Sequence, residues 1–242
     1  MAIDCILAMT PGEIQANDID FGNIGWLSCR FSHDDTGLTN LPGPMPPDSL
    51  LILDDSHPLD DHAPGQMLSQ LREILTAGSW IGLLLDFQRP ENPKAAELAK
   101  VLTASLPCPV AVSDQYAQEL NCPVFLPPVP PDTPLSAYLH PWKGREIWLD
   151  IAPTEMEILL TPQGATATFP SKGTCPLGTV HADPELHCHY SVEATQDYAR
   201  FRLFRTEEDL VALIGHAEEW GVSKFVGLWQ ELGEFPAFSA KR

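Results

Sequence analysis

Continuous apolar runs separated by amphipathic helices constrain the fold of this chain more than any other feature. Six runs are candidate strands, at residues 5–10, 25–31, 50–54, 81–87, 110–113 and 124–126. Several are apolar at successive positions rather than at every second one, which is typical of strands buried on both faces. Both faces of such a sheet must be covered, so the pattern predicts a parallel sheet with helices packed on it.

Three helices are also visible, at residues 66–77, 93–106 and 206–220. We expect the first to end at Gly78 in the left-handed conformation. Asn92 is placed to cap the second, with Pro93 at its first position. Thr206 and Asp209 form a capping-box pattern at the start of the third. Each helix leads within a few residues into an apolar strand, which is the repeating unit of right-handed parallel crossovers.

Residues 1–242 are expected to form a single barrel-like domain of the α/β class, an irregular (β/α)8-like (TIM) barrel. A chain of 242 residues with 44% hydrophobic residues can bury one core of this size. Residues 114–121 leave room for only a short crossover, so the barrel is expected to be irregular there. An open, doubly wound sheet is the alternative.

The pattern changes from residue 145 onward. Partial alternation of apolar and polar residues recurs in five segments, at 146–152, 156–161, 165–169, 188–194 and 198–204. Such alternation is typical of antiparallel strands with one solvated face, and Thr161-Pro162-Gln163-Gly164 fits a tight turn. We therefore expect an antiparallel β insertion at residues 145–205, followed by the last helix and a final strand at 225–229.

The chain is strongly acidic, with a formal net charge of −19 and only 14 Lys and Arg residues. Such a field repels phosphate backbones and anionic lipid, so neither nucleic acid nor a membrane is an expected partner. No apolar run is long enough to span a bilayer, and no basic leader precedes one. Six cysteines without a Cys-x-x-Cys pair indicate free thiols in a reducing, cytoplasmic compartment.

Motifs exclude several classes of enzyme. The sequence has no Gly-x-Ser-x-Gly elbow, phosphate-binding loop or dinucleotide fingerprint, so no cofactor is expected. One group of thiols and imidazoles invites a zinc site but lacks the usual ligand spacing, so no metal site is expected; its members are Cys175, His181, His187, Cys188 and His189. Within it, His187 and His189 are expected to share one face of a strand. Asp60, Asp61 and His62 are interpreted as a polar loop.

Functional side chains of parallel α/β folds gather where strands end, because the loops at that edge surround a pocket. This criterion selects seven candidate ligand-binding residues at three strand ends: Asp54, Asp55, His57, Asp86, Gln88, Trp229 and Glu231.

Two segments resemble a known family. The segment Ile-Gly-Leu-Leu-Leu-Asp-Phe-Gln at 81–88 resembles the fourth-strand signature of chitinase-like, family 18 glycoside hydrolases, in which spaced aspartates lead to a glutamate acid. The ending at 217–229 is similar to the last helix and strand of that family, whose tryptophan floors the sugar site. The resemblance implies the barrel, the antiparallel insertion and a sugar platform at Trp229.

The departures from that signature imply a degenerate site. Asp86 falls on the last aspartate of the motif, but Leu84 replaces the preceding one and Gln88 stands where the acid glutamate belongs. The glutamate of the family protonates the leaving oxygen, and an amide has no proton to give at neutral pH. We therefore expect no catalytic residue, and expect a glycan or similar small neutral ligand to bind at the strand ends.

Two alternatives stay open. In one, the chain is an active glycoside hydrolase with relocated carboxylates, drawn from Asp54, Asp55 and Glu231. In the other, it is a non-catalytic scaffold whose proline-rich loops at 36–48 and 127–134 meet a protein partner. The sequence does not identify that partner or the oligomeric state.

Overall fold

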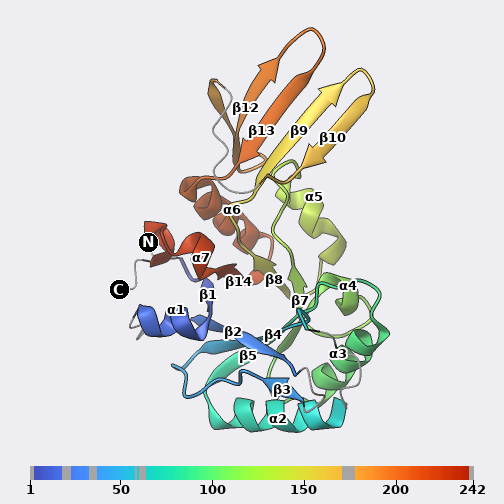
Figure 1. The fold of residues 1–242 in the computed structure, drawn as a ribbon, viewed down its shortest axis with the longest axis vertical. Helices are drawn as coiled ribbons and strands as arrows, with labels where there is room; N and C mark the ends of the chain where they lie inside the picture. The colour runs from blue at the N-terminus through green and yellow to red at the C-terminus, as the bar shows by residue number, and fades with distance from the viewer. Residues whose placement is uncertain are drawn as a thin grey trace. The chain divides into compact units, whose positions relative to one another are not determined.

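The fold was analysed in a computed structural model that describes residues 3–17, 23–32, 37–57, 59, 64–170 and 178–239 (Figure 1). The chain divides into two compact units. The barrel unit contains the residues up to 127, residues 144–150 and the residues from 223 onward. The second unit contains residues 128–143 and 151–222.

Eight parallel strands form a closed barrel, as the sequence predicts. They are β1 (Ile6–Met9), β2 (Ile24–Phe31), β4 (Ser49–Asp54), β5 (Trp80–Asp86), β6 (Val110–Ser113), β7 (Val124–Leu126), β8 (Ile147–Asp150) and β14 (Val222–Leu228). Their order is β1-β14-β8-β7-β6-β5-β4-β2, and β1 also pairs with β2, which closes the ring and rules out the open sheet. A two-residue strand, β3 (Leu38–Thr39), pairs antiparallel with the end of β2.

Helices α1 (Pro11–Ala16), α2 (Pro64–Ala77), α3 (Pro93–Ser105), α4 (Asp114–Ala117), α7 (Trp229–Leu232) and α8 (Pro236–Ser239) belong to the barrel unit. Asn92 caps α3 as predicted, accepting hydrogen bonds from the backbone N–H groups of Lys94 and Ala95. The crossover after β6 is the four-residue helix α4, so the predicted irregularity is confirmed.

The predicted left-handed cap at Gly78 is wrong, because Gly78 is not among the described residues with positive φ. A Cβ atom at this position would lie 2.5 Å from the indole nitrogen of Trp80. That nitrogen donates to the carbonyl of Ile74, 3.1 Å away. Gly78 therefore leaves room for an indole packed over the end of α2.

The interior of the barrel is filled by side chains from alternate positions of the strands. The buried members are Ile6, Ala8, Leu50, Ile52, Leu84, Ala111, Phe125, Trp148 and Val226. Trp148 is the largest of them and is fully buried. A Cβ atom on Gly82 would lie 3.1 Å from its ring, so the glycine makes space for the indole. The barrel centre is thus packed core.

The segment at 146–152 was predicted as an antiparallel strand, and this is wrong. Residues 147–150 form β8, a parallel strand of the barrel between β7 and β14. Ile147, Trp148 and Leu149 are all buried, as expected of a strand covered on both faces. The last strand also ends one residue earlier than predicted, so that Trp229 opens helix α7.

The second unit contains the predicted antiparallel sheet. Its strands are β9 (Glu155–Thr161), β10 (Gly164–Thr168), β11 (Val180–Asp183), β12 (Cys188–Ala194) and β13 (Ala199–Phe204), in the order β10-β9-β13-β12-β11. Helices α5 (Leu135–Leu139), η1 (His140–Trp142) and α6 (Glu207–Glu219) complete the unit. Thr161 pairs with Gly164, so the predicted turn joins β9 to β10. Strand β11 was missed because it is short and mostly exposed.

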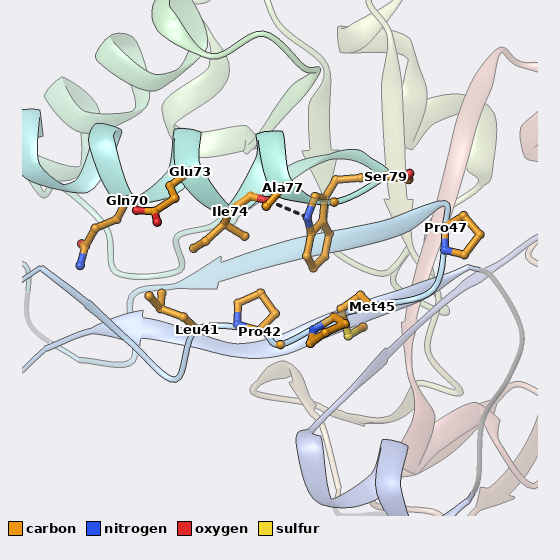
Figure 2. A pocket seen from close by; sticks show the side chains of 13 residues that line it. Leu41, Pro42, Met45, Pro47, Gln70, Glu73, Ile74, Ala77 and Ser79 are labelled. Carbon is orange, nitrogen blue, oxygen red and sulfur yellow. Dashed lines mark hydrogen bonds between the residues drawn. The ribbon is translucent and has the colours of Figure 1, made fainter.

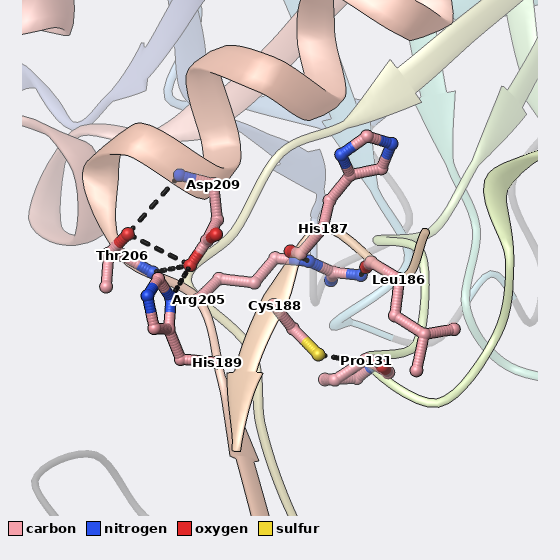
Figure 3. A network of polar contacts seen from close by, with 8 residues as sticks. All are labelled: Pro131, Leu186, His187, Cys188, His189, Arg205, Thr206 and Asp209. Carbon is pink, nitrogen blue, oxygen red and sulfur yellow. Dashed lines mark hydrogen bonds and ion pairs between the residues drawn. The ribbon is translucent and has the colours of Figure 1, made fainter. Parts of the chain in front are cut away.

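A buried arginine ties the base of this sheet to a neighbouring loop (Figure 3). Arg205 is 5% exposed, and its guanidinium donates to the carbonyl oxygens of Val129, Pro130, Leu186 and His187 and to the hydroxyl of Thr154. Burial is the largest influence on the guanidinium and lowers its pKa to about 10, which leaves it charged at neutral pH.

Candidate ligand site at the mouth of the barrel

The carboxyl ends of β4 and β5 bring Asp54 and Asp86 side by side. The two residues are register partners in the parallel pairing of these strands. Ile52 and Leu84 belong to the interior cluster, and side chains of a strand alternate between its faces. The carboxylates two residues further along each strand therefore face the barrel axis at its mouth.

Asp54 is held in an ion pair and a turn. One of its oxygens lies 3.3 Å from Nε of Arg30, and the other accepts the backbone N–H of Ser56 at 2.8 Å. Arg30 is the register partner of Asp54 on β2. The sequence reading missed Arg30, although it sits at a strand end and the criterion used for the other candidates would have found it.

Asp86 and Gln88 form a second polar pair at the mouth. The amide nitrogen of Gln88 lies 3.3 and 3.2 Å from the two carboxylate oxygens of Asp86. Burial raises the pKa of Asp86 to about 6; the Gln88 amide opposes this shift, and the negative charges of Asp54 and Asp55 add to it. Asp86 is thus protonated in part of the population near pH 6. The side chain of Gln88 is exposed to solvent.

Asp55 is a buried carboxylate that holds the backbone of the loop after β5. It is only 4% exposed, and its two oxygens accept the backbone N–H groups of Gln88 and Arg89, each at 2.9 Å. The Arg89 guanidinium returns a 2.6 Å hydrogen bond to the carbonyl of Ser56. These contacts fix the loop after β5 against the loop after β4, so Asp55 positions Gln88.

His57 is turned toward the backbone. Its Nδ1 lies 3.0 Å from the carbonyl oxygen of Phe31, at the end of β2. The imidazole is half-buried, and it connects the loop after β4 to the neighbouring strand.

Trp229 and Glu231 come from the opposite side of the barrel. Strands β8, β7 and β6 separate β14 from β5 in one direction, and β1, β2 and β4 separate them in the other. Both side chains lie on α7 and are half-buried. A Cβ atom on Gly233 would lie within 2.8 Å of the Trp229 ring, so the glycine packs directly against the indole.

Further polar groups complete the rim. Ser113 ends β6, accepts the N–H of Phe87 at 2.9 Å and donates to the carbonyl of Leu85 at 3.1 Å. The hydroxyl of Tyr116 donates to the carbonyl of Arg89 and accepts the N–H of Asn92. Neither residue was selected from the sequence, because serine and tyrosine after a strand carry no distinctive spacing.

The described members of the candidate metal group have other partners. In the part of the chain that the structure describes, no group of three or more metal-binding side chains comes together. His187 Nε2 lies 3.0 Å from Nδ1 of His216. His189 Nδ1 lies 2.7 Å from a carboxylate oxygen of Asp209 (Figure 3). His187 and His189 do not share a strand face as predicted, because β12 begins at Cys188 and His187 has a φ of +50°.

Some expectations fall on residues that the structure does not describe. Cys175 and the loop residues Asp60, Asp61 and His62 lie outside the described ranges. The five described cysteines are free thiols, as predicted. Among the described helices, none has the length and hydropathy needed to cross a membrane.

Comparison with known proteins gives a fold and no sequence match. Neither protein-family profiles nor curated protein sequences match the chain. Among solved structures, a chitinase from Chromobacterium violaceum is similar with a TM-score of 0.59 and 9% identity, covering 98% of this chain and 97% of that one. The Bacillus cereus spore cortex-lytic enzyme SleL is similar with a TM-score of 0.56 and 10% identity, over 93% of this chain and 70% of that one.

The chain has a chitinase-like fold. Identities near 10% carry no residue roles across, so this likeness concerns the backbone alone. Within the chitinase-like fold, the paired carboxyl groups and the exposed amide lie where strands end, which is where barrels of this architecture place their functional groups.

Proposed function

We propose that the mouth of the barrel binds a glycan or similar neutral ligand without carrying out the standard hydrolysis of family 18 enzymes. The observation that carries this proposal is the exposed Gln88 amide, hydrogen-bonded to Asp86 at the position where the resemblance places the acid glutamate. An amide at this position holds a hydroxyl or an acetamido group but donates no proton to a leaving oxygen.

The distribution of groups around the mouth supports a sugar ligand. Hydrogen-bonding groups gather at the ends of β4 and β5, and Trp229 follows the opposite strand. A pyranose ring stacks its C–H face on an indole while polar groups bond its hydroxyls. The similar structures include a chitinase and a cortex-lytic enzyme, and a glycan ligand for this chain agrees with those names.

Isothermal titration of N-acetylglucosamine oligomers tests the proposal. We expect binding by the intact chain and a loss of about five- to thirtyfold in affinity for Trp229→Ala, which corresponds to a stacking contact of about 1–2 kcal/mol. Trp220→Ala is the matched control, because that tryptophan is 48% exposed and belongs to the second unit. Equal affinities of the Trp229→Ala and intact proteins would remove the indole from the site, and no binding across a wide glycan panel would end the proposal.

A second candidate function is glycoside hydrolysis by relocated carboxylates. The observation that favours it is the difference between two neighbours: Asp54 is paired with Arg30, whereas burial and nearby charge raise the pKa of Asp86 to about 6. An ionised carboxylate beside a protonated one is the arrangement that general base and general acid require. Turnover of fluorogenic glycosides near pH 6, abolished in both Asp54→Asn and Asp86→Asn and retained in Glu231→Gln, would support this pair as the catalytic one.

A further inference from the structure

A cavity lies in the barrel unit, away from the strand ends that form the mouth. It has a volume of about 690 Å³ and runs between helix α2 and the proline-rich loop that connects β3 to β4 (Figure 2). The loop leads into the start of β4, and Trp80 at one end of the cavity begins β5. The cavity therefore lies toward the opposite edge of these two strands from Asp54 and Asp86, where barrels rarely place their functional groups.

Both ends of the proline-rich loop are fixed. The indole N–H of Trp26 donates to the carbonyl of Asn40 at 3.0 Å, and the hydroxyl of Ser49 donates to the carbonyl of Pro46 at 2.7 Å. The N–H of Asp48 donates to the carbonyl of Ser79 at 2.9 Å. Prolines within the loop restrict φ further. The groove is thus preformed, and a ligand does not have to order its walls.

The prolines and the engaged indole reduce the number of N–H donors in the walls of the groove. Pro42, Pro44 and Pro47 line the groove and have no N–H group. The indole N–H of Trp80 is already bonded to Ile74. The remaining lining is mixed: it includes Leu41, which is 40% exposed, and the polar side chains of Gln70 and Ser79. An extended peptide needs backbone hydrogen bonds, and the prolines of this wall cannot donate them. A compact apolar ring does not need them.

One charged side chain marks the edge of the groove. Glu73 is the only ionisable residue among those that line it, and it is exposed. It lies on the same face of α2 as Gln70, Ile74 and Ala77, opposite the loop (Figure 2). The aromatic face of Trp80, which also lines the groove, attracts cations.

We propose that this groove binds a small organic cation, an apolar ring system that carries one basic nitrogen. The ring lies against Trp80 and the prolines, and the ammonium group lies near Glu73. A cavity of about 690 Å³ is of the size that accepts such molecules. The net charge of −19 raises the local concentration of cations around the chain and disfavours anionic ligands.

Three probes that share a naphthalene ring and differ in charge test the proposal: 2-naphthylmethylamine, 2-naphthalenemethanol and 2-naphthoate. We expect calorimetric affinities in the order cation, neutral, anion, with the cation favoured over the neutral probe by about fivefold or more. Glu73→Gln should abolish this preference and leave the neutral probe unaffected. Glu97→Gln, an exposed glutamate on α3, is the matched control and should keep it.

A blocking variant locates the site. Ala77 is exposed at the end of α2 and lines the groove, so Ala77→Leu fills the cavity without touching the core. Loss of cation binding in this variant, with an unchanged melting temperature, supports the proposal. Cation binding that survives both Ala77→Leu and Glu73→Gln places the probe elsewhere and overturns it, as does equal affinity of the intact chain for the cation and the neutral probe. Absence of binding up to millimolar concentration also overturns it.

Discussion

The side-chain amide of Gln88 donates to both carboxylate oxygens of Asp86, at 3.3 and 3.2 Å. The amide nitrogen of Gln88 thus donates to a neighbour within the candidate site, and the amide oxygen is an acceptor by its chemistry. The same contact opposes the rise in the pKa of Asp86 that burial causes. This contact therefore influences both the hydrogen bonding and the ionisation of Asp86.

Asp86→Asn is expected to change how stability depends on pH. The pKa of Asp86 is raised from 3.8 to about 6 in the folded chain. The contribution of Asp86 to the free energy of unfolding is therefore fully present below about pH 4 and is lost as pH rises through 6. The asparagine variant does not titrate, so it should gain roughly 1–2 kcal/mol relative to the intact chain between pH 4 and 7, after allowance for partial exposure. Urea unfolding at several pH values measures this, and parallel profiles would contradict it.

Asp55→Ala is expected to destabilise the barrel unit by about 2–4 kcal/mol. The substitution leaves two backbone N–H groups, at Gln88 and Arg89, without their buried acceptor. Asp55→Asn keeps one acceptor oxygen and should therefore lose less stability than Asp55→Ala. Denaturant midpoints of the two variants measure the difference. A loss below about 0.5 kcal/mol for the alanine variant would show that water replaces the carboxylate.

Arg205→Lys is expected to lower the free energy of unfolding by about 3 kcal/mol, almost as much as Arg205→Met. The guanidinium bonds four carbonyl oxygens and one hydroxyl in a fixed fan, and an ammonium group has three donors and a different shape. Hydrogen exchange of the second unit should show faster opening of β12 and β13. Arg200→Lys, at a half-buried ion pair with Glu157, is the control and should change stability by less than about 1 kcal/mol. Full rescue by lysine would refute the proposed importance of the fan.

His187→Asn is expected to make the second unit less sensitive to acid. Burial lowers the pKa of His187, and the charges of His216 and Arg205 lower it further, against the opposing effects of Asp209 and Asp183. The stability of this site is therefore present above the ordinary value of 6.5 and is lost as pH falls below it. Asparagine tolerates the φ of +50° and does not titrate. Urea midpoints of the variant should fall less between about pH 7 and 5 than those of the intact chain. His140→Asn, in the exposed position before Pro141, serves as the control.

Local sequence patterns determined most of the barrel. Strands β6 and β7 were predicted to the residue, because apolar runs bounded by turn residues are covered on both faces wherever they occur. The cap at Asn92 and the capping box of Thr206 with Asp209 were also predicted, since each depends on residues within one turn of a helix. Asp86 and Gln88 were selected together as candidates at one strand end, but the hydrogen bond between them was not predicted.

Only the tertiary structure decided how the strands close and which polar groups meet. Strand β8 was assigned to the wrong sheet because its neighbours, β7 and β14, lie far from each other in sequence. Arg30 meets Asp54 across 24 residues, and Asp55 meets Arg89 across 34. The pKa of Asp86 depends on burial and on the negative charges of Asp54 and Asp55. Local sequence patterns indicate which face of an element a residue occupies. The distance between two strand ends and the dielectric environment around their side chains depend on how the barrel closes.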